Sequence, residues 1–187
     1  LLTIHCETDF VAKNEDFTAA AKNLADKALS EGVEALKAAA PEALALVSQK
    51  MGEKIELGRC EEITGGTIGA YVHNGKSAVV VQLEGGTQEL AKDIAMHIAA
   101  MKPAYMTRDE ISEEAKQQAK EVFEKEVAES DKPEEIKAKM LEGKVTTYFK
   151  EQTLMDQSFI KNPDQTIKAL LESNKATMKK FIRESIG

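Results

Sequence analysis

The chain has 187 residues, of which 42% are hydrophobic and 30% charged, and its formal net charge is −7. These values predict one or two small soluble domains. Lysines and arginines are scattered among acidic residues, so we expect no basic stripe that binds nucleic acid directly. No apolar run approaches the roughly 20 residues that cross a bilayer, so we expect no membrane association. Two cysteines, Cys6 and Cys60, are too few for a disulfide framework, which favours the cytoplasm or an organelle matrix.

A strand and two helices are predicted at the start of the chain. The apolar run Leu2 to Cys6 is typical of a strand, and the next three residues supply capping groups that start a helix. Gly32 ends this helix, and a second is predicted to begin at Pro41 and to end at Gly52. The inward-facing residues are Phe17, Ala21, Leu24 and Ala28 in the first helix, and Leu44, Val47 and Met51 in the second.

Antiparallel strands are predicted next. Residues 53–64 alternate between apolar and polar side chains, which indicates a half-buried strand. Residues 67–73 and 76–84 are two further strands, and Asn74-Gly75 between them is a strong hairpin signal. A helix follows Gly85-Gly86-Thr87 and stops before Pro103. Its expected apolar face is Leu90, Ile94, Ile98 and Met101.

A polar helical hairpin is predicted between residues 108 and 152. Thr107 and Glu110 have the spacing of a capping box, and the helix that they open carries only a thin apolar seam. The seam of the outgoing helix is Ile111, Ala115, Val122 and Val127, and that of the return helix is Ile136, Met140, Leu141, Val145, Tyr148 and Phe149. After the hairpin, Asn162 to Gln165 is expected to start another helix, and residues 178–186 to form a last strand.

These elements predict an α+β fold with antiparallel sheets covered by helices. We expect a first core subdomain at residues 1–64, and a second at 65–107 with 153–187. The antiparallel hairpin at 108–152 is inserted into the second subdomain.

Catalytic chemistry is not indicated. His5 and Cys6 are neighbours on a strand, so their side chains point to opposite faces. A metal site built from His5, Cys6, Cys60 and His73 lacks the close ligand spacing of zinc sites. The glycine pairs lack the Lys and Ser or Thr of a phosphate loop. We therefore expect no catalytic residue, no metal site and no bound cofactor.

Two motifs resemble those of the elongation factor Ts family. One is Thr8-Asp9-Phe10-Val11-Ala12-Lys13-Asn14 followed by Phe17, and the other runs from Ile94 to Pro103 and contains His97. The resemblance implies two related α+β subdomains with a coiled-coil hairpin inserted in the second. It also implies that a small N-terminal domain of the family is missing before Leu1, and we expect weaker partner binding without it.

The resemblance further implies a function. Such a protein binds elongation factor Tu, in its GDP-bound and nucleotide-free states, and promotes GDP release by disturbing the partner's magnesium and phosphate site. It is a guanine nucleotide exchange factor of translation rather than an enzyme. The implied partner-binding residues are Thr8, Asp9, Phe10, Val11 and His97, with Phe10 acting as a wedge.

Simpler roles stay open for these residues. Asp9 can be a helix cap, Phe10 can extend the apolar stripe of Phe17, and His97 can be a hydrogen-bonded packing residue. Two other functions are also open. The chain can be a structural module that forms a homodimer through its hairpin, or a small cysteine hydrolase.

Overall fold

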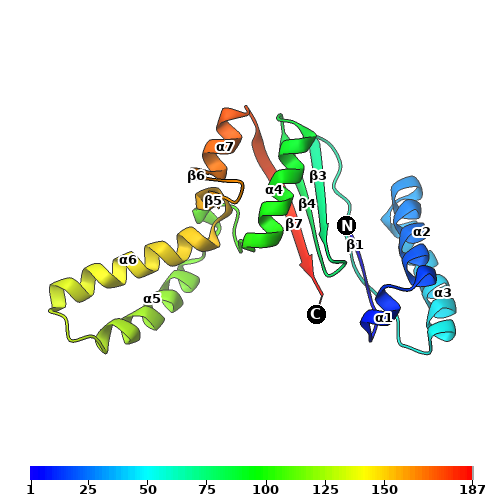
Figure 1. Cartoon of the computed structure of the whole chain (residues 1–187), viewed down its shortest axis with the longest axis horizontal. Helices are drawn as coiled ribbons and strands as arrows, with labels where there is room; N and C mark the ends of the chain where they lie inside the picture. The colour runs from blue at the N-terminus through cyan, green and yellow to red at the C-terminus, as the bar shows by residue number, and fades with distance from the viewer. Residues whose placement is uncertain (187) are drawn as a thin grey trace. The chain divides into compact units, whose positions relative to one another are not determined.

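The computed structural model describes residues 1–186, and its small antiparallel sheets packed by helices confirm the predicted α+β class (Figure 1). The chain forms two compact units. One combines residues 1–95 with the chain from Met178 on, and the other is Met96–Thr177. The predicted subdomains stay a prediction, because compactness alone does not define a folding domain. Within the described residues, no helix is both long enough and apolar enough to span a membrane.

The first unit begins with a two-stranded ladder and a pair of helices. Strand β1 (Leu2–His5) pairs antiparallel with β2 (Glu56–Cys60), and helix α2 (Glu15–Glu31) packs against α3 (Val33–Met51). Burial of their facing apolar side chains stabilises this arrangement. The buried cluster is Ile4, Val11, Phe17, Leu24, Leu36, Ala40, Leu44, Val47 and Ile55.

The predicted helix start at Pro41 is wrong, because Pro41 lies inside α3. The boundary between the two helices lies earlier, at Gly32, whose φ of 92° is readily available only to glycine. A proline inside a helix removes one backbone hydrogen bond. Leu36 and Ala40 precede it on the buried face of the same helix, and their burial offsets this loss.

A three-stranded sheet completes the first unit. Strands β3 (Thr67–His73), β4 (Ser77–Glu84) and β7 (Thr177–Ser185) pair in the order β3-β4-β7. The predicted turn at Asn74-Gly75 is confirmed, with φ angles of 52° and 68°. Helix α4 (Gln88–Met101) approaches β3 so closely that a Cβ on Gly69 would lie 2.2 Å from the carbonyl carbon of Ala91.

The predicted inner face of α4 needs one correction. Leu90, Ile94 and Ile98 are buried, but Met101 is exposed at the end of the helix. The first three follow a spacing of four residues, and Met101 comes only three after Ile98, in the last turn. Lys102 then takes a positive φ of 50°, and Pro103 follows it.

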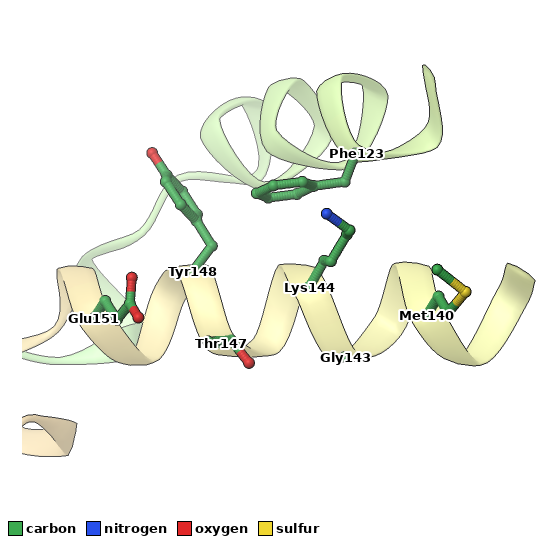
Figure 2. Close-up of a pocket in the computed structure, with 7 residues that line it drawn as sticks. All are labelled: Phe123, Met140, Gly143, Lys144, Thr147, Tyr148 and Glu151. Atoms are coloured by element: carbon green, nitrogen blue, oxygen red, sulfur yellow. The ribbon is translucent and has the colours of Figure 1, made fainter. Parts of the chain in front are cut away.

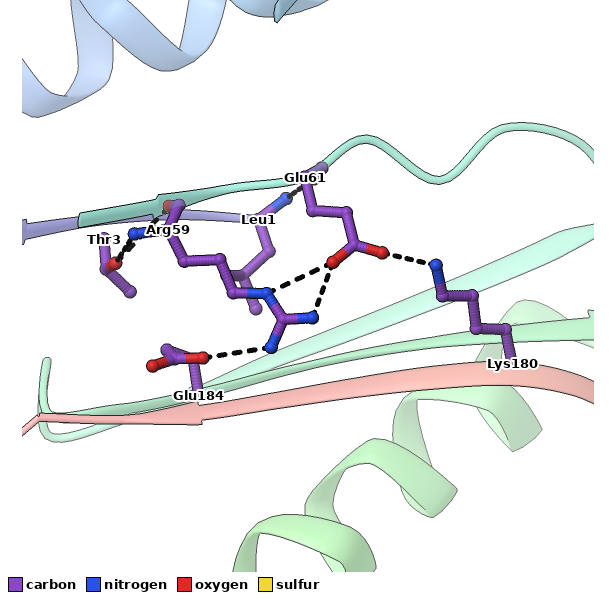
Figure 3. A network of polar contacts seen from close by, with 6 residues as sticks. All are labelled: Leu1, Thr3, Arg59, Glu61, Lys180 and Glu184. Atoms are coloured by element: carbon purple, nitrogen blue, oxygen red, sulfur yellow. Dashed lines mark hydrogen bonds and ion pairs between the residues drawn. The ribbon is translucent and has the colours of Figure 1, made fainter. Parts of the chain in front are cut away.

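Charged side chains connect the ladder to the last strand of the sheet (Figure 3). Arg59 of β2 donates hydrogen bonds to Glu61, at 2.6 Å, and to Glu184 of β7, at 3.1 Å. Lys180 of β7 donates to the other carboxylate oxygen of Glu61. The two cations hold the pKa of Glu61 below its usual range, Lys180 contributing most. Strands that are distant in sequence are thereby held together.

The second unit contains the helical hairpin. Helix α5 (Glu113–Ala128) packs against α6 (Glu134–Gln152), as Figure 1 shows. The predicted capping box is wrong: Thr107 precedes a short 3₁₀ turn, η1 (Arg108–Glu110), and makes no side-chain cap bond. Ser112 caps α5 instead, because its hydroxyl accepts a hydrogen bond from the Ala115 N–H.

The hairpin seam also differs from the prediction at Val122, which is exposed. Positions four apart stack on one helix face, so the inner stripe of α5 includes Ala119 and Phe123 rather than Val122. On α6, Phe149 is buried as predicted, whereas Ile136 and Tyr148 are 45% and 39% exposed. The hairpin therefore presents apolar side chains to solvent.

The predicted helix start at Asn162 is wrong too. After turn η2 (Leu154–Asp156), strand β5 (Ser158–Phe159) pairs antiparallel with β6 (Asn162–Thr166). Helix α7 (Ile167–Ser173) begins only after this hairpin, capped by the Thr166 hydroxyl, which accepts from the Ala169 N–H at 3.2 Å. An Asn-Pro pair starts turns as readily as helices. In this chain Asn162 begins a strand, because β6 pairs with β5.

Candidate functional site

The Thr8–Val11 segment forms a separate short helix instead of the start of α2. Thr8 is extended and caps α1 (Asp9–Ala12), with its hydroxyl accepting a hydrogen bond from the Val11 N–H at 3.4 Å. Lys13 ends this turn, and Asn14 caps α2 through the Asp16 N–H at 2.8 Å. The single helix predicted here is therefore two helices, and the α1 tip, defined as Thr8–Val11, projects as its own turn.

Phe10 and Val11 have opposite environments in this tip. Val11 is 6% exposed and belongs to the first buried cluster, whereas Phe10 is 89% exposed. Phe17, seven residues later, is 8% exposed. The alternative that Phe10 extends the core stripe of Phe17 is therefore wrong. The break between α1 and α2 changes the direction of the helix face between the two rings.

Asp9 lies beside the β3–β4 hairpin. Its carboxylate forms an ion pair with the Lys76 ammonium group at 3.0 Å. The hydrogen bond from Lys76, together with its charge, holds the pKa of Asp9 below its usual range. Both side chains are largely exposed, so the pair orients the tip more than it stabilises the fold. No local sequence pattern predicts that residues 9 and 76 meet.

Glu53 is a second residue at this tip that no sequence pattern predicts. It follows Gly52, which ends α3 in the left-handed conformation, and its carboxylate reaches the residues before α1. One oxygen accepts from the N–H groups of Glu7, at 3.2 Å, and Thr8, at 3.0 Å. The other accepts from the Thr8 hydroxyl at 2.5 Å. No local pattern links two segments so far apart in the chain.

His97 is a packing residue in this structure. Its side chain is 0% exposed and lies near the ring of Phe159. The Ile160 N–H donates to Nδ1 at 3.2 Å, so Nε2 carries the proton and donates to the Gln157 amide oxygen at 2.9 Å. Burial lowers the pKa of His97 against the opposing effect of the Gln157 bond. The ring therefore presents no surface for direct contact with a partner.

The surroundings of Cys6 disfavour a nucleophilic thiol. Cys6 and Cys60 are partly buried against the first cluster, and the Cys6 thiol donates to the Thr8 carbonyl at 3.4 Å. Burial, and then the negative charge of Glu53, raise the pKa of the Cys6 thiol. A raised pKa disfavours the thiolate that a nucleophile requires. Within residues 1–186, no three His, Cys, Asp or Glu side chains gather as a set of metal ligands.

Shallow hollows lie on the helical hairpin. Figure 2 shows one of them, with Lys144 directed toward the Phe123 ring. The Lys144 ammonium group lies 5.7 Å from the centre of that ring. Tyr148 meets the same ring edge-on, with ring centres 5.6 Å apart. Thr147 points away on the other side of α6. The few polar groups do not converge on one point, which is unlike a small-molecule site.

Comparison with known proteins identifies relatives over the whole chain. A family model described as Elongation factor TS matches residues 7–187. Elongation factor Ts of Thioalkalivibrio sulfidiphilus is 40% identical over 199 aligned residues, which cover 100% of this chain and 68% of that protein. Elongation factor Ts of Cellvibrio japonicus is 39% identical over 189 residues, covering 98% and 65%. The chain spans about two thirds of the length of these relatives.

Proposed function

The chain belongs to the elongation factor Ts family of translation elongation factors, and from this premise we propose that it binds elongation factor Tu and promotes GDP release. It acts through protein–protein contact and catalyses no bond-breaking step. The relatives named above come from bacteria, so we propose the bacterial cytoplasm as its location, with an organelle matrix as the alternative.

The exposed Phe10 ring is the observation that supports this proposal. A large aromatic side chain that is 89% exposed contributes little to the fold of its own chain. Aromatic residues that enter a partner's pocket are, however, among the strongest anchors of protein interfaces. The α1 tip carries this ring next to a carboxylate, that of Asp9. We propose that Thr8, Asp9 and Phe10 form the partner-binding surface of this tip, with Phe10 as its wedge, and that the buried Val11 supports the tip from the core.

The proposed mechanism is a displacement at the partner's nucleotide site. Magnesium there connects phosphate oxygens to protein oxygens in strict octahedral geometry, so a small shift of its ligands weakens nucleotide binding. A wedge that moves the supporting segments of elongation factor Tu produces such a shift. Because the coupling is reciprocal, nucleotide weakens binding of the factor as much as the factor weakens binding of nucleotide.

His97 enters the proposal indirectly. Its ring holds the backbone of Ile160, whose side chain is exposed at the turn between β5 and β6. We propose that His97 orients this turn for contact with elongation factor Tu, rather than touching the partner itself.

The deciding experiment measures release of fluorescent GDP from elongation factor Tu while this chain is titrated in. We expect the rate of GDP release to rise with chain concentration and to approach a plateau, and we expect the released GDP not to be hydrolysed. Release at the uncatalysed rate at every concentration, together with no binding to elongation factor Tu, would contradict it.

A second candidate function is self-association through the hairpin. Val122, Ile136 and Tyr148 leave part of their apolar side chains exposed on α5 and α6, and a partner helix could cover them. Sedimentation equilibrium distinguishes the two functions. A homodimer that is lost when Val122 and Tyr148 are replaced by Ser, with exchange unaffected, would assign the hairpin this separate role.

A further inference from the structure

We propose that Glu53 is a positioning residue for nucleotide exchange, because its carboxylate fixes the α1 tip and thereby aims Phe10. This inference rests on the proposed exchange function. Glu53 makes no proposed contact with the partner, since its oxygens are directed at Glu7 and Thr8 of its own chain.

The bonds to Glu53 form a fork around the start of α1. Two successive backbone N–H groups, those of Glu7 and Thr8, converge on one carboxylate oxygen. The Thr8 hydroxyl donates to the other oxygen, and it accepts from the Val11 N–H. Bonds to an ionised acceptor are roughly twice as strong as neutral ones. The fork therefore determines both the position and the direction of the first turn.

Glu53 is itself held firmly by the end of α3. The Ser48 hydroxyl donates to the Glu53 carbonyl at 2.5 Å, and the Gly52 N–H bonds to the Ser48 carbonyl. A reciprocal bond runs from the Lys54 N–H to the Glu7 carboxylate at 3.3 Å. Since α3 is buried through Leu36, Leu44 and Val47, these bonds connect the tip to the rigid core.

Rigidity of the tip matters because the Phe10 ring is 89% exposed, so its position depends mainly on the backbone that carries it. An exposed ring on a mobile segment must be ordered during binding, which reduces the productive fraction of encounters. A ring on a fixed turn is already oriented when it reaches the partner. Removing the fork should therefore slow exchange while the core of the free protein stays folded.

The test compares Glu53→Ala and Glu53→Gln with Glu56→Ala as the matched control. Glu56 is an exposed glutamate three residues later, and it pairs with Lys54 rather than with the tip. In Glu53→Gln the amide oxygen can accept both N–H bonds, and the amide nitrogen can donate to the Thr8 hydroxyl. We expect Glu53→Ala to lower the maximal exchange rate about tenfold. Glu53→Gln should stay within about threefold of the parent, and the control should match it.

A spectroscopic signal makes the positioning role visible without the partner. The chain contains no tryptophan, so Phe10→Trp introduces a single fluorescent reporter at the tip. We expect Glu53→Ala to lower the fluorescence anisotropy of this reporter, and Glu53→Gln and Glu56→Ala to leave it unchanged. Should Glu53→Ala fail to fold, Glu53→Asp replaces it, because its shorter side chain withdraws the oxygens but keeps the charge.

The outcomes separate this inference from the function on which it rests. Phe10→Ala in the same assay tests the wedge alone, and parental exchange by that variant refutes the wedge, whereas release at the uncatalysed rate with the parent chain refutes the proposed function. Slow exchange by Phe10→Ala with parental exchange by Glu53→Ala overturns the positioning role only. Unchanged anisotropy in Glu53→Ala also overturns the positioning role. The same holds if Glu53→Ala melts so far below Glu56→Ala that unfolding accounts for its lost activity.

Discussion

Replacing Phe10 by Ala should leave the free protein almost as stable as the parent. The side chain is 89% exposed, so only about a tenth of it is buried in the fold. Full burial of a Phe is worth about 1.5–3 kcal/mol, which makes the loss here roughly 0.2–0.3 kcal/mol. For a chain of this length that corresponds to a shift of about 1 °C in the melting temperature. Thermal unfolding followed by circular dichroism measures this shift.

The effect on exchange should be much larger. An interface anchor contributes about 2 kcal/mol or more, and each 1.36 kcal/mol changes a rate tenfold, so exchange should slow by roughly 30-fold. Stopped-flow release of fluorescent GDP from elongation factor Tu, measured over a range of chain concentrations, separates the maximal rate from apparent affinity. We expect most of the loss in the maximal rate, because the wedge acts within the complex.

Phe17→Ala is the matched control, because the same residue type is only 8% exposed there. Deleting a buried Phe ring costs about 3–5 kcal/mol, so this variant should melt far below the parent. Two results would refute the assignment of Phe10. One is strong destabilisation of Phe10→Ala, and the other is a stable Phe10→Ala that exchanges at the parental rate.

Three further predictions concern other parts of the chain. Lys76→Ala should raise the pKa of Asp9 toward its ordinary value of about 3.9, because it removes the hydrogen bond and the charge that lower it. Carboxyl NMR titration measures this pKa, with Lys54→Ala as control, and an unchanged value would disprove the ion pair in solution. Burial lowers the pKa of His97, so below about pH 6.5 the unfolded chain binds more protons and stability should fall as pH drops. Urea unfolding between pH 7.5 and 5 tests this, and a slope equal to that of His97→Gln would contradict it. Replacing Asp109–Glu151 by a short Gly-Ser linker should leave a cooperative thermal transition. Tyr105, before the deletion, keeps its backbone hydrogen bonds to Gln152 and Leu154, which follow the deletion. Loss of that transition would show that the hairpin belongs to the core.

Features set by neighbouring residues could be predicted from the sequence. The Asn74-Gly75 turn needs only two residues that tolerate positive φ, and both occur there. Burial of Leu24 and Leu44 follows from helical spacing within one element. Exposure of Phe10 could not be inferred in this way. Its spacing from Phe17 indicates a shared face only if the helix is continuous, and it breaks at Asn14.

Local sequence patterns do not predict which residues hold the α1 tip in place. Glu53 and Lys76 reach Thr8 and Asp9 from other elements of the fold, and surface glutamates and lysines are ordinarily solvated. The family resemblance indicated the tip itself but gave no information on what holds it. Tertiary burial also overrode a local signal at Pro41, where the helix continues because its apolar face packs on the core.

The strand order β3-β4-β7 has a consequence for synthesis on the ribosome. Strand β4 is the middle strand, yet its second neighbour, β7, begins only at Thr177, after helix α4, the helical hairpin and α7 have been made. During that interval β4 has an open edge on a strand that carries Val79, Val81 and Leu83. Such an edge is a template for pairing with another chain. Protection from aggregation during translation therefore depends on how quickly β7 docks once it is made.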